Sequence, residues 1–310
     1  MMAAEGDNNN FVRYIYRGEV EEFIPLHVTH IIVREDVTVV LAAAFYRHPN
    51  IVEVICHDKV EEIEEDAFYH CPSLRRLIMP GVTIVGRDAC YECAALTDVE
   101  CAKLEIIGGD AFCRCTSLRS INLPSVRIVK MLAFDYCTDL VDVKFGNKLE
   151  RIDRGGFVDC HSLERITIPL KDYIFTYDNI FRACDDLNHV HLVEGALLQE
   201  TIAALLLEEW RNDMNEEVDS INQILPNTPA GDWDYGEGGK AQAIRVWIRS
   251  VLRKIVHYKA EHQRILDGAA TTLQRAVPRD IMMNNVMPFL ALPSHTFEGE
   301  NGRPSRSIYW

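Results

Sequence analysis

The chain has 310 residues, of which 48% are apolar and 25% are charged, which is enough apolar material for one large or two smaller domains and excludes a wholly disordered chain. Its formal net charge of −15 at pH 7 argues against a general nucleic-acid binder and against a protein held on anionic lipid by its own charge. The sequence contains no recognisable signal peptide and no apolar run of about 18 residues, so we expect a soluble cytoplasmic or nuclear protein without a membrane span.

A repeated phrase dominates the first two thirds of the chain. It reads Ala-Phe-x-x-Cys-x-x-Leu-x-x-Φ-x-Φ, where Φ is apolar, and it recurs seven times between residues 44 and 192. Its leading Leu position recurs at steps of 22 to 24 residues and is filled by Ile51, Leu74, Leu96, Leu118, Leu140, Leu163 and Leu187. The last two apolar residues of each copy fall on one side of a short strand, so a copy buries its apolar side only by stacking on the next one. The pattern predicts a solenoid over residues 28–193.

The segments between these strands predict the rest of each repeat. Apolar pairs such as Ile84 and Val85 indicate a second short strand, and acidic segments such as 64–66 indicate one helical turn that carries the following Phe inward. Residues 28–33 and 37–40 are typical of the strands of a degenerate first repeat, which would cap the open end of the stack. Residues 1–27 are interpreted as an N-terminal tail and lead-in segment.

The copies over residues 63–80 and 118–124 resemble the unit of the BspA-type leucine-rich-repeat family, Ile-x-x-x-Ala-Phe-x-x-Cys-x-x-Leu-x-x-Ile-x-Ile-Pro. The resemblance covers roughly residues 28–193, and many algal and protist proteins are similar, including a trailing helical segment. Departures such as Cys90 in the Phe position and His48 in the first Cys position predict local repacking. The resemblance implies an α/β repeat solenoid of short strands and short helical turns that acts as a general protein-binding scaffold, and such a fold does not by itself fix a function.

The ten cysteines are expected to be thiols, and nine have a packing explanation. The repeated Cys position holds Cys71, Cys93, Cys115, Cys137, Cys160 and Cys184. Cys56 and Cys101 occupy inward strand positions and Cys90 a Phe position, whereas Cys113 has no inward assignment. An alternative is a zinc site made of Cys90, Cys93, Cys113 and Cys115, but the repeat alone accounts for three of these four residues, which favours a packed core.

Catalytic and cofactor motifs are not evident. His189 and His191 fall on one side of the last strand, where they would bind a metal or act as an acid and base, but no third ligand occurs at a matching position, and an exposed polar pair is the favoured interpretation. Phosphate-binding glycine loops, nucleophile elbows and zinc-protease motifs are missing from the sequence. We therefore expect neither an enzyme nor a cofactor, and no small-molecule substrate is indicated.

The outward strand residues are the candidate binding site, because curved solenoids offer a concave strand face to their partners. This face carries Arg76, Asp98, Glu100, Asn122, Asp142, Lys144, Arg165, His189 and His191. It mixes charges of both signs and has no aromatic anchor, so Arg76 and Arg165 are the favoured contact residues. The alternative is a solvated sheet face without a dedicated ligand. The partner we expect is a protein whose identity the sequence does not give.

The repeat stops near residue 194, and residues 194–290 predict an α-helical hairpin with a short third helix. Apolar residues recur every three or four positions over 196–225, and again over 240–276 after a glycine-rich loop at 227–239. Residues 194–219 hold eight acids and one base, whereas 240–264 hold seven bases and one acid. We expect these helices to pair with each other. The alternative, that the basic helix binds an external acidic partner or membrane surface, stays open.

Two short segments complete the sequence. Residues 277–290 resemble the opening of an F-box, which would imply a ubiquitin-ligase substrate adaptor with the repeats as substrate reader. That match needs a one-residue insertion, and the usual order of F-box and repeats is reversed, so a short helix is favoured. Residues 291–310 are interpreted as a flexible tail.

Overall fold

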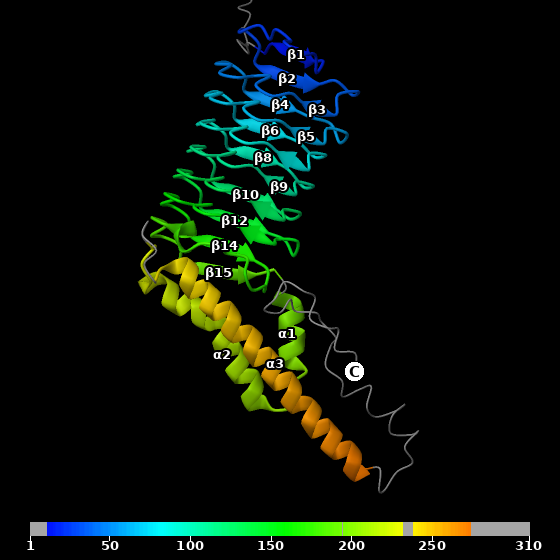
Figure 1. The fold of residues 1–310 in the computed structure, drawn as a ribbon, viewed down its shortest axis with the longest axis vertical. Helices are drawn as coiled ribbons and strands as arrows, with labels where there is room; N and C mark the ends of the chain where they lie inside the picture. The colour runs from blue at the N-terminus through cyan, green and yellow to red at the C-terminus, as the bar shows by residue number, and fades with distance from the viewer. Residues whose placement is uncertain (1–10, 194, 232–237, 274–310) are drawn as a thin grey trace, which may run out of the picture.

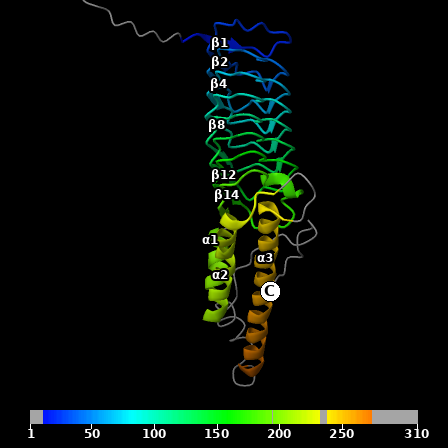
Figure 2. The same cartoon turned by 90° about the vertical axis from the view of Figure 1, so that its left-hand side faces the viewer.

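Residues 11–193 form a column of stacked coils, and helices continue from its C-terminal end (Figure 1). The structure, a computed structural model, describes residues 11–193, 195–231 and 238–273. The view turned by 90° shows the coils stacked without a marked bend (Figure 2). The strands that the sequence assigns to a concave face therefore form a long, nearly flat strip, which we call the front face.

Each coil places one strand on the front face and most add a shorter strand on the adjacent face. The front strands are β1 (Arg13–Tyr16), β2 (His30–Val33), β4 (Glu53–Ile55), β6 (Arg76–Ile78), β8 (Asp98–Glu100), β10 (Ser120–Leu123), β12 (Asp142–Phe145), β14 (Arg165–Ile168) and β15 (His189–Leu192). The strands of the adjacent face are β3 (Val39–Val40), β5 (Glu62–Ile63), β7 (Ile84–Val85), β9 (Ile106–Ile107), β11 (Ile128–Val129) and β13 (Arg151–Ile152). The predicted solenoid of stacked strands is confirmed.

The front sheet is divided, whereas the adjacent sheet is continuous from β3 to β13. All strand pairs are parallel, and the front strands form one group from β1 to β8 and a second from β10 to β15. The division follows the coil that carries Cys90 in place of Phe, where the inward Val99 of β8 is only partly buried. β1 pairs with β2, so the sheet also begins within the segment interpreted as a tail.

The repeat leucines lie inside one continuous core, as the repeat predicts. Those expected to form a single file are fully buried: Leu74, Leu96, Leu118 and Leu140. Next to them the turn phenylalanines stack, with ring centroids 5.1 Å apart for Phe45 and Phe68 and 5.1 Å apart for Phe134 and Phe157. Burying one such side chain stabilises the fold by about 1.5–3 kcal/mol, so each coil depends on its neighbours for its core.

The turn before each Phe is not helical, which corrects the prediction of a helical turn in most coils. Asp66 and His70 have φ values of 59° and 52°, in the left-handed region, and such residues interrupt a helix. The turn backbone instead bonds to the next coil, as where the Phe68 amide donates to the Ala89 carbonyl at 2.7 Å. Only the last turn contains a short 3-10 helix, η1 (Asp178–Phe181), among the coils described.

All ten cysteines are free and buried, which confirms the packing interpretation and adds a polar reason for it. The six in the repeated Cys position donate their thiol hydrogen over 2.9 to 3.2 Å to the backbone carbonyl of the Phe position one coil earlier. Cys113, which had no inward assignment, is also buried, with 3% of its surface exposed. Burial raises the pKa of Cys56 and Cys101 to about 12, so both thiols stay protonated at neutral pH.

The first C-terminal helix is divided, and the prediction of one long helix over 196–225 was wrong. It consists of α1 (Gly195–Ala203) and α2 (Glu208–Ile224), followed by the 3-10 turn η2 (Leu225–Asn227). The break at 204–207 places Leu205 in the core, 4% exposed, where its carbonyl accepts a hydrogen bond from Arg211. The first turn of α2 carries Glu208 and Glu209, and the positive N-terminal end of the helix dipole stabilises their negative charges.

The second predicted helix is α3 (Lys240–Leu273), and residues 274–276 lie outside the described part of the chain. Tyr258 donates to Asp213 at 2.6 Å and the Trp247 indole donates to the Glu217 carbonyl at 2.9 Å. Residues late in α3 thus meet residues early in α2, and the two helices run antiparallel (Figure 1). The described C-terminal part thus holds three α-helices, α1, α2 and α3, instead of two. The expected two-helix hairpin is not confirmed.

The bases of α3 pair with acids on two sides. Lys254 lies 2.9 Å from the Asp213 carboxylate of α2, and Arg249 lies 2.9 Å from Asp172 in the last part of the solenoid. For these residues the structure shows internal pairing. Among the described helices, none combines the length and the apolar content needed to cross a membrane.

Candidate functional site

The predicted site residues lie along the front face in two columns that run parallel to the axis of the coils. The first column holds Arg13, His30, Glu53, Arg76 and Asp98, and after the division Ser120, Asp142, Arg165 and His189. The second holds Ile15, Ile32, Ile55, Ile78 and Glu100, and after the division Asn122, Lys144, Thr167 and His191. All nine predicted residues therefore share one face.

Four isoleucines in register form an apolar row on this face, which we call the isoleucine column: Ile15, Ile32, Ile55 and Ile78. Their strand neighbours Ile31, Val54 and Leu77 point inward and are fully buried, so the isoleucines point outward. Ile15 is 56% exposed, and the other three are partly buried. Sequence reasoning missed this row, because β1 and β2, which supply Ile15 and Ile32, lack the repeated phrase.

Arg76 joins three carboxylates from neighbouring coils beside this row. Its guanidinium lies 3.2 Å from Glu53, 3.0 Å from Asp98 and 2.7 Å from Glu100. The side chains of Arg76, Asp98 and Glu100 are 45–52% exposed, so solvent screens each of these pairs strongly. Three acids around one base leave a local excess of negative charge at this end of the isoleucine column.

The second strip of the front face is more polar. Lys144 lies 3.3 Å from Asp142, and Arg165 lies 2.8 Å from Glu164 beside it. His189 and His191 stack on β15 with ring centroids 6.1 Å apart. In the part of the chain that the structure describes, no group of three His, Cys, Asp or Glu side chains is arranged to hold a metal. The zinc candidate Cys90, Cys93, Cys113 and Cys115 is therefore not such a group either.

The turns carry two features that the sequence reasoning did not single out. Tyr46, Tyr69 and Tyr91 stack at centroid distances of 5.0 Å, and their common place directly after the Phe position was the available signal. Burial, together with the charge of Asp159, raises the pKa of Asp135 to about 6. The Cys113 thiol lies 3.9 Å from Asp135, and burial raises its pKa too, so this pair supplies no thiolate for nucleophilic chemistry.

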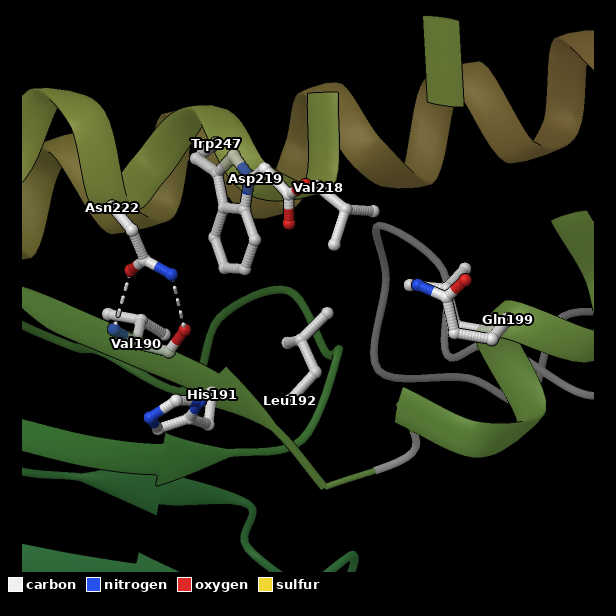
Figure 3. A pocket seen from close by; sticks show the side chains of 9 residues that line it. Val190, His191, Leu192, Gln199, Val218, Asp219, Asn222 and Trp247 are labelled. Carbon is white, nitrogen blue, oxygen red and sulfur yellow. Dashed lines mark hydrogen bonds between the residues drawn. The ribbon is translucent and has the colours of Figure 1, made fainter. Parts of the chain in front are cut away.

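A hollow of about 220 Å³ lies where the last coil meets the helices (Figure 3). Leu192 of β15 and Trp247 of α3 border it, and His191 lies at its margin. Asn222 of α2 faces the edge of β15, where its side-chain oxygen accepts a hydrogen bond from the Val190 amide at 2.8 Å and its side-chain nitrogen donates to the Val190 carbonyl at 3.4 Å. The side-chain amide takes the place of a further strand and closes this end of the sheet.

The geometry defines a leucine-rich-repeat solenoid. A family model described as "BspA type Leucine rich repeat region (6 copies)" matches residues 21–125 and 105–202, so the chain belongs to this family. The sequence matches none of the curated proteins with which it was compared. The F-box-like residues 277–290 lie outside the described residues and stay a hypothesis.

Several solved structures are similar to part of this chain. The chain is similar to a leucine-rich-repeat protein of T. pallidum, with 24% identity and a TM-score of 0.45 over 57% of this chain and 78% of that one. It is similar to a leucine-rich cell surface protein from Faecalibacterium prausnitzii, with 20% identity and a TM-score of 0.28 over 53% of this chain and 60% of that one. The pneumococcal vaccine antigen PcpA has 16% identity and a TM-score of 0.35 over 58% of this chain and 65% of that one.

Proposed function

We propose that the chain is a non-enzymatic scaffold that binds a partner protein on its front face. Proteins built from leucine-rich repeats generally serve as protein-interaction scaffolds. The isoleucine column beside the Arg76 cluster carries the proposal, because an outward-facing apolar row flanked by charge is typical of surfaces that another protein covers.

The charged residues have a different role from the apolar ones in this proposal. Arg76 and Arg165 are already paired with carboxylates of the same chain, so a new contact with either exchanges one ion pair for another. The isoleucines supply most of the binding free energy, and Arg76, Asp98 and Glu100 set orientation and specificity. Asn122, Asp142, Lys144, Arg165, His189 and His191 extend the contact onto the second strip.

A co-purification experiment with paired variants tests the proposal. The double variant Ile55→Glu plus Ile78→Glu places charge in the isoleucine column, and the control Ser120→Glu plus Thr167→Glu places it at front-face strand positions of the second strip that are outside the proposed contact. We expect the first variant to lose a partner that wild type retains, at an unchanged melting temperature, and the control to lose less of it. Equal partner recovery from all three chains would remove the front face as the binding surface.

We also propose a cytoplasmic location, because all ten cysteines are free thiols and an oxidising compartment would act on any that open. Fractionation of native cells, with antibody detection and trapping of thiols at lysis, measures this directly. Recovery at the cell surface, or with oxidised cysteines, would contradict it.

A further inference from the structure

The spacing of the isoleucine column limits what shape of partner fits it. Neighbouring strands in a sheet lie about 4.7–4.9 Å apart, so the four isoleucines on β1, β2, β4 and β6 span about 14–15 Å along the axis of the coils. A partner covering all four side chains must therefore present apolar groups about once every 5 Å along that axis.

An α-helix meets this requirement and an extended chain does not. One side of a helix presents residues i, i+3 or i+4, i+7, and i+10 or i+11, which advance by about 5.4 Å per turn and span about 15–16.5 Å. An extended segment presents one side chain per two residues on each side, or about 6.6 Å, and loses register with the column by the third position. The front face also shows no marked bend in the orthogonal view, so a straight rod can follow the column (Figure 2).

The charges at the end of the column indicate a further property of the partner. Glu100 follows Ile78 directly in the same column, and Asp98 lies beside it on β8. Both carboxylates are 52% exposed and share the single guanidinium of Arg76. A lysine or arginine one helical turn beyond the fourth apolar residue would lie next to these two acids and relieve their repulsion.

We propose that the isoleucine column binds an amphipathic helix of a partner protein, aligned with the axis of the coils, with four apolar residues at helical spacing and a base that faces Asp98 and Glu100. This inference rests on the proposed scaffold function and specifies its partner. The helix crosses β1, β2, β4 and β6 in turn, and its length of contact is set by the four coils.

Photo-cross-linking of the full-length chain in its native cells tests the helix. Benzoylphenylalanine is placed singly at positions 32, 55 and 78, with position 167 as the matched site on the second strip. We expect the first three sites to capture one partner segment, at positions that advance by three or four residues from coil to coil. An advance of about two residues per coil, or capture of unrelated segments, would overturn the helix but leave a scaffold that binds extended or irregular surfaces.

A synthetic peptide with the captured sequence supplies the second measurement. Its helical circular dichroism should rise on binding to the wild-type chain, Ile55→Glu should weaken binding at least tenfold, and Thr167→Glu should change it by less than twofold. A peptide that binds without gaining helix would contradict the inference alone. Capture at position 167 without capture at 32, 55 or 78 would contradict the helix inference and leave the proposed scaffold function standing. No capture from any of the four sites would reject both the front face as a binding surface and the proposed function.

Discussion

Asn222 closes the last strand of the solenoid, and its replacement should loosen that end of the molecule first. Val190 is 3% exposed, and both its amide and its carbonyl bond to the Asn222 side chain. In Asn222→Ala both backbone groups lose this partner. An unsatisfied buried donor or acceptor costs about 1–3 kcal/mol, and the longer 3.4 Å bond contributes least, so we expect a loss of about 1–3 kcal/mol in total.

Hydrogen exchange of the Val190 amide is the most direct assay, since stability in stacked repeats is local. A loss of 1–3 kcal/mol corresponds to exchange that is about 5- to 150-fold faster. Ser220→Ala is the control, because the Ser220 hydroxyl bonds to the Glu217 carbonyl within the same helix. Unchanged Val190 protection in Asn222→Ala would refute the view that this amide replaces a missing strand. Equal loss in Ser220→Ala would assign the effect to α2 as a whole.

Three further predictions concern the core. Leu118→Ala, in a fully buried position, should lower the free energy of urea unfolding by about 3–5 kcal/mol, whereas Ile265→Ala, at 40% exposure, should change it by less than about 0.5 kcal/mol. Burial lowers the pKa of His48, so as the pH falls the unfolded chain takes up a proton at this side chain before the folded chain does. The free energy of unfolding should therefore fall as the pH drops below about 6.5, and melting curves should show a smaller fall for His48→Asn. Ellman's reagent at pH 8 should label none of the ten buried thiols until urea is added, and rapid labelling of Cys113 would contradict its burial.

The inward half of the solenoid could be predicted from the sequence because a repeat carries its own register. The Leu position at steps of 22 to 24 residues requires each copy to face the same way, so Leu74 and Leu118 had to be buried whatever surrounds the column. The Cys position followed in the same way. The helical turns were predicted incorrectly because the backbone donors of those turns bond to the next coil, and a partner on another coil cannot be deduced from local propensity.

The outward half could be predicted only in part. The nine candidate residues follow from strand alternation, and the structure places all of them on the front face. Ile15 and Ile32 joined the row only through the pairing of β1 with β2, in segments without the repeated phrase. Likewise, the three acids around Arg76 come from the two coils on either side of it, Glu53 from β4 and Asp98 and Glu100 from β8, and their meeting depends on the pairing register.

The sequence by itself determined that the side chains at the repeated Leu and Cys positions are buried, because spacing along the chain fixes the inward side of a repeat. Only the tertiary structure decided how the chain continues beyond the repeats. Leu205 divides the predicted long helix by entering the core, and Asn222 closes the sheet with a side-chain amide. Both outcomes depend on contacts between segments far apart in the chain, where hydrogen bonds and burial outweigh the local preference for a continuous helix.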